Sequence, residues 1–85
     1  MIELYQHEYC SGCSRVRRKL TDLGLDWISR TVDPDHRNRQ KVIDLVGQPS
    51  VPVLVDVEHR MIVTEAHDIC AYLDETYGPG ATGEP

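Results

Sequence analysis

The sequence predicts an α/β protein with a four-stranded mixed sheet and helices on both faces, formed in the order β-α-β-α-β-β-α. Three kinds of pattern predict it: short strand-like runs, apolar residues at helical spacing, and glycine or proline at the boundaries. The chain has 85 residues, enough for one small core and too few for a second. We therefore expect one domain over residues 1–77 and a flexible tail over residues 78–85.

The first part of the chain predicts two strands joined by a helix. Residues 2–6 alternate as a strand does, and residues 25–32 are rich in β-branched and aromatic side chains. A helix is predicted over residues 14–23, closed by Gly24, because its apolar residues recur at helical spacing: Val16, Leu20 and Leu23. A right-handed crossover makes the two strands parallel.

The middle of the chain predicts a second helix. Asp33 is a typical N-cap, Pro34 fits the first helical position, and Gly47 ends an apolar face made of Val42, Leu45 and Val46. The two prolines of residues 48–52 then force a turn.

The last part of the chain predicts a hairpin and a third helix. Residues 53–57 and 61–64 read as two strands joined by a short turn. The helix begins at Thr64 or Glu65 and ends before Gly78, with a buried stripe made of Ile69, Ala71 or Tyr72, Leu73 and Tyr77.

Two cysteines lie where the first predicted strand meets the first helix. Unpaired N–H groups and partial positive charge at a helix start stabilise a thiolate, so we expect a lowered pKa for Cys10. Cys13 lies one helical turn further on the same face, within reach of Cys10. A reversible disulfide between the two is the expected product.

Charge and composition exclude several classes of function. The chain has 9 basic and 14 acidic residues and a net charge of -5, which argues against binding to nucleic acid or to anionic membranes. It has neither a membrane-length apolar run nor the pattern of a signal peptide, so we expect a cytoplasmic monomer. We interpret the basic residues of the first two predicted helices as solvated charges; for the first helix, the alternative is that they add positive potential near Cys10. These residues are Arg15, Arg17, Arg18 and Lys19 in the first helix and Arg37, Arg39 and Lys41 in the second.

The cysteine count favours redox chemistry over a disulfide framework, because three is an odd number. Cys10 and Cys13 could also be two of the four ligands of a zinc ion, but His7 and the other histidines lack the spacing of a second pair, so we expect no metal site. Cys70 is interpreted as a small buried apolar side chain, and His59 and His67 as surface residues.

Three motifs in this element order resemble the glutaredoxin branch of the thioredoxin-like superfamily, over residues 1–77. They are Tyr9-Cys10-x-x-Cys13, Ser50-Val51-Pro52 before the third strand, and Thr64-Glu65-Ala66 with Ile69 and Tyr72-Leu73 in the last helix. The resemblance implies a thioredoxin-like (glutaredoxin) fold. It also implies that Pro52 is cis and faces Cys10, which leaves the main chain of Val51 free to pair with a bound thiol peptide.

The last segment is also similar to the amino-terminal domain of glutathione transferases, in which a Glu-Ser pair holds the γ-glutamyl group of glutathione. Here the pair is Glu65-Ala66, which keeps only the carboxylate, and Glu65 is equally well explained as a helix-start carboxylate. A transferase also needs an all-helical second domain, so we do not expect that activity. Together the two resemblances imply a thiol- or glutathione-binding site made of Tyr9, Val51, Pro52, Glu65, Ala66 and Asp68.

The sequence departs from the glutaredoxin pattern around the cysteines. The spacer Ser11-Gly12 stands where Pro-Tyr is usual and predicts a more flexible, more open loop. His7 stands where the family often has a lysine. These departures leave the identity of the small thiol open.

The resemblance implies a thiol-disulfide oxidoreductase that serves electron transfer and redox homeostasis in the cell. Cys10 attacks a disulfide, and Cys13 or a low-molecular-weight thiol such as glutathione resolves the intermediate, with a reductase as a further candidate partner. The alternative is a glutaredoxin that carries a 2Fe–2S cluster between the Cys10 residues of two chains, completed by glutathione thiols. A redox-regulated interaction module is a third hypothesis.

Overall fold

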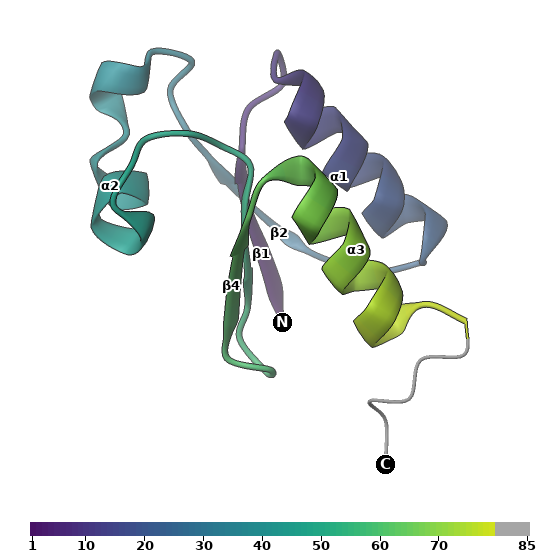
Figure 1. Cartoon of the computed structure of the whole chain (residues 1–85). Coiled ribbons are helices and arrows are strands. Elements are labelled where there is room, and N and C mark those ends of the chain that lie inside the picture. Colours follow the sequence, from purple (N-terminus) through teal and green to yellow (C-terminus); the bar gives the residue numbers. More distant parts are fainter. Residues whose placement is uncertain (80–85) are drawn as a thin grey trace.

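The computed structural model describes residues 1–79 of the chain. A four-stranded sheet lies between α1 and α3 on one face and α2 on the other (Figure 1). The strands are ordered β2-β1-β3-β4, with β1 parallel to β2 and the other pairs antiparallel. This confirms the predicted fold class. The elements are β1 (Ile2–Gln6), α1 (Ser11–Asp22), β2 (Ile28–Thr31), the 3-10 helix η1 (His36–Asn38), α2 (Gln40–Val46), β3 (Val53–Asp56), β4 (Met61–Thr64) and α3 (Ala66–Tyr77).

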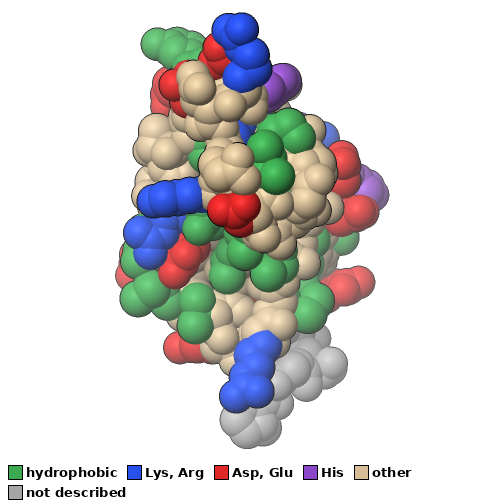
Figure 2. All heavy atoms as spheres, turned by 90° about the vertical axis from the view of Figure 1, so that its left-hand side faces the viewer, with side chains coloured by type: hydrophobic (Ala, Val, Ile, Leu, Met, Phe, Trp, Pro, Cys, Tyr) green, Lys and Arg blue, Asp and Glu red, His purple; other side chains and the backbone are tan. Residues whose placement is uncertain are grey.

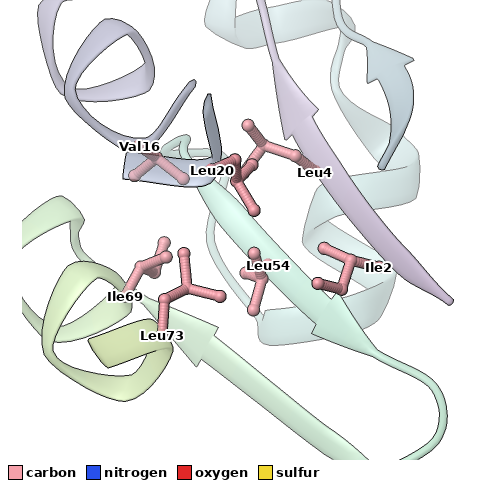
Figure 3. Packing of buried hydrophobic residues seen from close by; sticks show 7 residues of the cluster. All are labelled: Ile2, Leu4, Val16, Leu20, Leu54, Ile69 and Leu73. Atoms are coloured by element: carbon pink, nitrogen blue, oxygen red, sulfur yellow. The ribbon is translucent and has the colours of Figure 1, made fainter. Parts of the chain in front are cut away.

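The hydrophobic core lies between the sheet and the pair α1 and α3. Alternate residues of β1 point into it, as the strand period requires, so Ile2 and Leu4 are buried while Glu3 and Tyr5 are half-buried. Burying each large aliphatic side chain stabilises the fold by about 1.5–3 kcal/mol. The core is formed by Ile2, Leu4, Val16, Leu20, Leu54, Ile69 and Leu73 (Figure 3). It fixes α1 on the sheet and thereby the position of the cysteines at its first turn.

Two predicted boundaries in the first part of the chain were wrong. Helix α1 begins at Ser11, three residues earlier than predicted, because Cys10 acts as its N-cap and accepts the first helical hydrogen bond from Ser14. Strand β2 begins at Ile28 instead of residue 25. The Leu25 N–H donates to the carbonyl of Leu20, so Leu25 belongs to the turn that ends α1 and not to the strand.

The second helix also begins later than predicted. The side chain of Asp33 accepts a hydrogen bond from the Asp35 N–H at 2.9 Å, so Asp33 forms a turn instead of capping a helix. Asp35 caps the short η1 through the Arg37 N–H. The helix α2 follows only at Gln40 and ends, as predicted, at Gly47, which has a φ of 82°.

Arg39 is buried, with 3 % of its surface exposed, and the expectation of a solvated charge was wrong. Its guanidinium donates to the carbonyls of Asp33 at 2.8 Å, Pro49 at 3.0 Å and Pro34 at 3.0 Å. Five N–H groups in a fixed fork let one arginine satisfy several carbonyls in this way. Arg39 therefore ties the segment after β2 to the segment that precedes β3. Arg37 and Lys41 are exposed, as predicted.

A buried carboxylate ties α3 to the sheet. Asp56, the last residue of β3, is fully buried. One of its oxygens accepts hydrogen bonds from the hydroxyls of Tyr72 at 2.7 Å and Tyr77 at 2.6 Å and contacts the His59 ring at 2.9 Å. His59 is therefore a member of this network and more than a surface residue.

The helix α3 agrees with the prediction at most positions of its buried stripe. Ile69 and Leu73 are fully buried and Ala71 is exposed. The Gly78 N–H donates to the Asp74 carbonyl and ends the helix, and a Cβ at Gly78 would overlap that carbonyl. Within the described residues, no helix is both long and apolar enough to span a membrane. Most of the predicted tail, residues 80–85, lies outside the described part of the chain.

Candidate active site

Cys10 is the N-cap residue of α1. Its backbone is extended, with φ -92° and ψ 119°, and its sulfur accepts a hydrogen bond from the Cys13 N–H at 3.1 Å. The sulfur therefore lies where the free N–H groups and the positive end of the helix dipole point, which favours negative charge on it. The side chain is half-buried, so a substrate can reach it.

Cys13 lies in the first turn of α1 and is fully buried. Burial, together with the neighbouring Cys10, raises the pKa of the Cys13 thiol to about 12. At neutral pH Cys13 is therefore a protonated thiol that solvent does not reach. The two cysteines are chemically different although both are in the reduced form.

Cys10 should react with iodoacetamide at neutral pH at least about tenfold faster than Cys13, because thiolate, and not thiol, is the nucleophile. Peptide fragmentation by mass spectrometry after timed alkylation measures the two rates separately. In denaturant the rates should converge, which provides the control. Equal rates in the folded protein would contradict the assignment of Cys10 as the nucleophile.

The three predicted motifs meet at one place in the structure. The Val51-Pro52 peptide bond is cis, as the resemblance implies. A Cβ at Gly12 would lie 3.3 Å from the Pro52 ring and 3.4 Å from the Ala66 side chain, so the backbone of Gly12 packs against both. The expectation of a flexible spacer was wrong, because Ser11 and Gly12 are the first residues of α1.

The main chain of Val51 is available next to Cys10. The Cys10 sulfur lies 3.8 Å from the Val51 carbonyl, a long and weak contact for a thiol donor. No described residue accepts a hydrogen bond from the Val51 N–H. Ser50 is held by a hydrogen bond from its N–H to the Gln48 side chain at 2.8 Å. An extended peptide could therefore pair with Val51 as an added strand does.

The residues that begin α3 form the far side of this site. Glu65 has a positive φ of 73°, a backbone conformation that costs about 1–3 kcal/mol for a residue with a side chain. It is the N-cap residue of α3, so the interpretation as a helix-start carboxylate stays open, although its exposed side chain makes no capping hydrogen bond. Asp68 is exposed in the first turn of α3. Tyr9 is 84 % exposed, and only its N–H is held, by the His7 ring at 3.2 Å.

The sequence left positive potential from Arg17 near Cys10 as an alternative, but it did not predict that the segment before α2 also contributes basic groups near the cysteine loop. The pKa of His7 is lowered by partial burial and then by the charges of Arg39, His36 and Arg17. Arg39 and His36 come from the segment before α2, which only the fold brings near. A signal for Arg17 was present in the sequence, since Gln6 is a polar residue on the inward face of β1 and needs a partner.

The structure also contains a cavity away from the cysteines. A cavity of about 600 Å³ lies between β1, β2 and the segment around Arg39, with Tyr5 and Lys41 in its lining, and it contains neither cysteine. On the α2 side, acidic and basic side chains are interspersed (Figure 2). Among residues 1–79, no three metal-ligating side chains come together.

Comparison with known proteins places this site in a family. The sequence profile of the family "Glutathione S-transferase, N-terminal domain" matches residues 4–83. The Gene 56 protein of Mycobacterium phage L5 is 29% identical over 82 residues, which cover 96% of this chain and 80% of the phage protein.

Solved structures agree with that assignment. A glutathione S-transferase from Rhodospirillum rubrum superposes with a TM-score of 0.79 at 28% identity, covering 100% of this chain and 38% of the transferase. The chain therefore spans about two fifths of that protein. Glutaredoxin 2 of Salmonella typhimurium, solved in complex with glutathione, shares the fold with a TM-score of 0.82 at 23% identity, over 100% of this chain and 38% of its own. The chain belongs to the glutathione S-transferase N-terminal domain family, with the thioredoxin-like fold that glutaredoxin 2 also has.

Proposed function

We propose that the chain is a glutaredoxin-type thiol-disulfide oxidoreductase, acting on protein disulfides or on mixed disulfides with a low-molecular-weight thiol. The observation that carries the proposal is the position of Cys10. Its accessible sulfur accepts the Cys13 N–H at the start of α1, directly beside the cis Val51-Pro52 bond. The family assignment makes a glutathione-linked role the natural one for such a thiol.

The reaction has two exchange steps. In the first, the Cys10 thiolate attacks one sulfur of the substrate disulfide. The substrate S–S bond breaks, a mixed disulfide with Cys10 forms, and the leaving thiolate takes up a proton. In the second, a resolving thiol loses its proton and breaks the mixed disulfide. Cys13 attacks the Cys10 sulfur and releases the other half of the substrate as a thiol, whereas a small thiol from solution attacks the substrate-derived sulfur, releases the Cys10 thiolate and forms a disulfide with the small adduct. If Cys13 is the resolving thiol, two external thiols later reduce the Cys10–Cys13 disulfide and are themselves oxidised to a disulfide.

Burial of Cys13 affects which thiol resolves the intermediate. Because the pKa of Cys13 is raised to about 12, its thiol loses a proton only with difficulty. A small thiol from solution therefore resolves small adducts readily. Cys13 is needed where a bulky protein partner shields Cys10 from solution.

Glutathione is the first candidate for the small thiol. It is bound in the solved glutaredoxin 2 of Salmonella typhimurium and in a glutathione transferase homolog from Drosophila mojavensis. In this chain, the Val51 main chain would pair with the cysteinyl part of such a thiol, and Glu65 would face its amino group. Tyr9, Pro52, Ala66 and Asp68 complete the proposed site. We also propose that the protein is cytoplasmic, since thiols remain reduced in that compartment. We propose further that it acts as a monomer.

The choice of electron donor tests the proposal. Wild-type protein is given a small mixed disulfide, with glutathione and its reductase, with other small thiols, or with a thioredoxin reductase. We expect turnover with glutathione or another small thiol, and loss of that turnover when Cys10 is alkylated beforehand. Absence of turnover with every donor would contradict an enzymatic role.

The same preparation distinguishes the cluster-carrying alternative. One chain offers a single accessible thiol at the site, so a 2Fe–2S cluster would require Cys10 from two chains together with external thiols. Iron and sulfide in equal amounts in freshly purified dimer would favour that alternative over the reductase.

A further inference from the structure

We propose that Arg17 is a positioning residue of the cysteine site, which holds the segment between β1 and Cys10 and supplies a permanent positive charge beside it. This inference rests on the proposed function of Cys10 and adds a residue to it. Of the two sequence-based interpretations of Arg17, it favours added positive potential near Cys10 over a solvated charge. The neighbouring Arg18 fits that interpretation, because it is exposed.

The guanidinium of Arg17 contacts the segment that leads to Cys10. One of its nitrogens donates to the Gln6 side-chain carbonyl at 2.6 Å and lies 3.4 Å from the His7 carbonyl. The same His7 carbonyl accepts from the Cys10 N–H at 3.4 Å. Arg17 and Cys10 are therefore joined through one backbone oxygen. The Arg17 side chain is only 22% exposed, which agrees with a fixed position.

Gln6 anchors the arginine to the sheet. Gln6 occupies the third inward-facing position of β1, after Ile2 and Leu4, and is 8% exposed. Its side-chain amide donates to the Ser29 hydroxyl on β2 at 2.7 Å and accepts from Arg17. A buried amide is stable only when both ends are hydrogen-bonded, and here both are. The chain Arg17–Gln6–Ser29 thus connects α1, β1 and β2 immediately before the cysteine loop.

The charge of Arg17 affects the pKa values of two residues that flank Cys10 in the chain, Cys13 and His7. Burial and the neighbouring Cys10 raise the pKa of Cys13, and Arg17 acts in the opposite direction. On the other side, partial burial together with Arg39, His36 and Arg17 lowers the pKa of His7, which leaves His7 mostly neutral at pH 7.

Other charged groups near the loop do not replace Arg17. Glu8 lies 4.0 Å from the guanidinium, but its side chain is 81% exposed and solvent screens it. Arg39 is held by three carbonyls of the segments next to α2. At the start of α3, Glu65 and Asp68 are exposed and acidic. Arg17 is therefore the permanent cation that α1 contributes to this site.

The test compares three variants of adjacent arginines. Arg17→Gln removes the positive charge and most of the N–H donors of the guanidinium, whereas Arg17→Lys keeps the charge. Arg18→Gln is the matched control, with the same change in net charge. The readout is the rate constant of Cys10 alkylation as a function of pH, measured by mass spectrometry. Circular dichroism and urea unfolding establish that each variant is folded.

We expect Arg17→Gln to slow Cys10 alkylation at neutral pH by about 3- to 10-fold, because it removes both the positive charge and the hydrogen bonds that hold the segment leading to Cys10. Arg17→Lys should recover part of the rate, and Arg18→Gln should match wild type. Identical profiles for the two Gln variants would overturn the proposal. So would a failure of Arg17→Lys to recover any of the lost rate. Alkylation needs no electron donor, so it tests Arg17 even if turnover fails with every donor.

Discussion

Cys10→Ser should abolish reduction of both protein disulfides and small mixed disulfides, whereas Cys13→Ser should lose the first activity and keep the second. A serine hydroxyl at position 10 is not ionised at neutral pH, so no attack on sulfur takes place. Cys13 only resolves the mixed disulfide, and a small thiol from solution can do the same for a small adduct. The rate of Cys13→Ser on a glutathionylated peptide should therefore stay within about an order of magnitude of wild type.

The third cysteine provides the matched control. Cys70 lies on α3 with its sulfur 4.0 Å from the Arg15 carbonyl, outside the site. Cys70→Ser should therefore keep both activities. Mixed disulfides with protein substrates should accumulate in Cys13→Ser and be visible on non-reducing gels. Equal losses in Cys10→Ser and Cys13→Ser on small adducts would instead indicate an obligate dithiol mechanism.

The strands and the site motifs were predictable from the sequence because their signals are local. Alternation in residues 2–6 and the strand-like run of residues 61–64 predicted the bounds of β1 and β4 as the structure has them. A cysteine pair at a strand-to-helix junction and a proline before a strand predict the place of the candidate site. The fold then brings Gly12, Pro52 and Ala66 into contact.

The errors arose where tertiary contacts override local preference. Asp33-Pro34 has the composition of a helix start, yet Asp33 bonds to the Asp35 N–H and the helix is delayed to Gln40. Arg39 looks like an ordinary surface arginine, but its partners are backbone carbonyls that only the fold brings near. Backbone carbonyls leave no trace in a sequence, so such a burial cannot be anticipated from residue types.

The Asp56 network should set the stability of the fold without affecting its chemistry. Burial alone would raise the pKa of the Asp56 carboxyl, but hydrogen bonds from Tyr77 and Tyr72 and the charge of His59 outweigh it, and the pKa is lowered below its ordinary 3.8. The same bonds and burial raise the pKa of Tyr72 to about 12. The other Asp56 oxygen has no partner among the described residues, so the network depends on a single oxygen.

The sign of the pH dependence follows from the lowered pKa. A carboxyl that is more acidic in the folded than in the unfolded state stabilises the fold above its unfolded pKa. That contribution is fully present at neutral pH. It is lost as the pH falls from about 4 through the lower pKa of the folded state.

Asp56→Asn should lower the free energy of unfolding at pH 7 by about 2–4 kcal/mol, because two tyrosine hydroxyls lose a charged acceptor. The difference from wild type should shrink as the pH is lowered below about 4, since wild-type Asp56 becomes protonated as the pH falls through its lowered pKa. Urea unfolding at a series of pH values measures both effects. Asp26→Asn, at an exposed aspartate before β2, is the control and should differ from wild type by less than about 0.5 kcal/mol. Asp56 lies at the opposite end of β3 from Pro52, so the folded Asp56→Asn protein should keep the wild-type rate of Cys10 alkylation. A stability difference that does not change with pH would contradict a contribution from the carboxylate charge and would assign the effect to the shape and neutral hydrogen bonding of the Asp56 side chain.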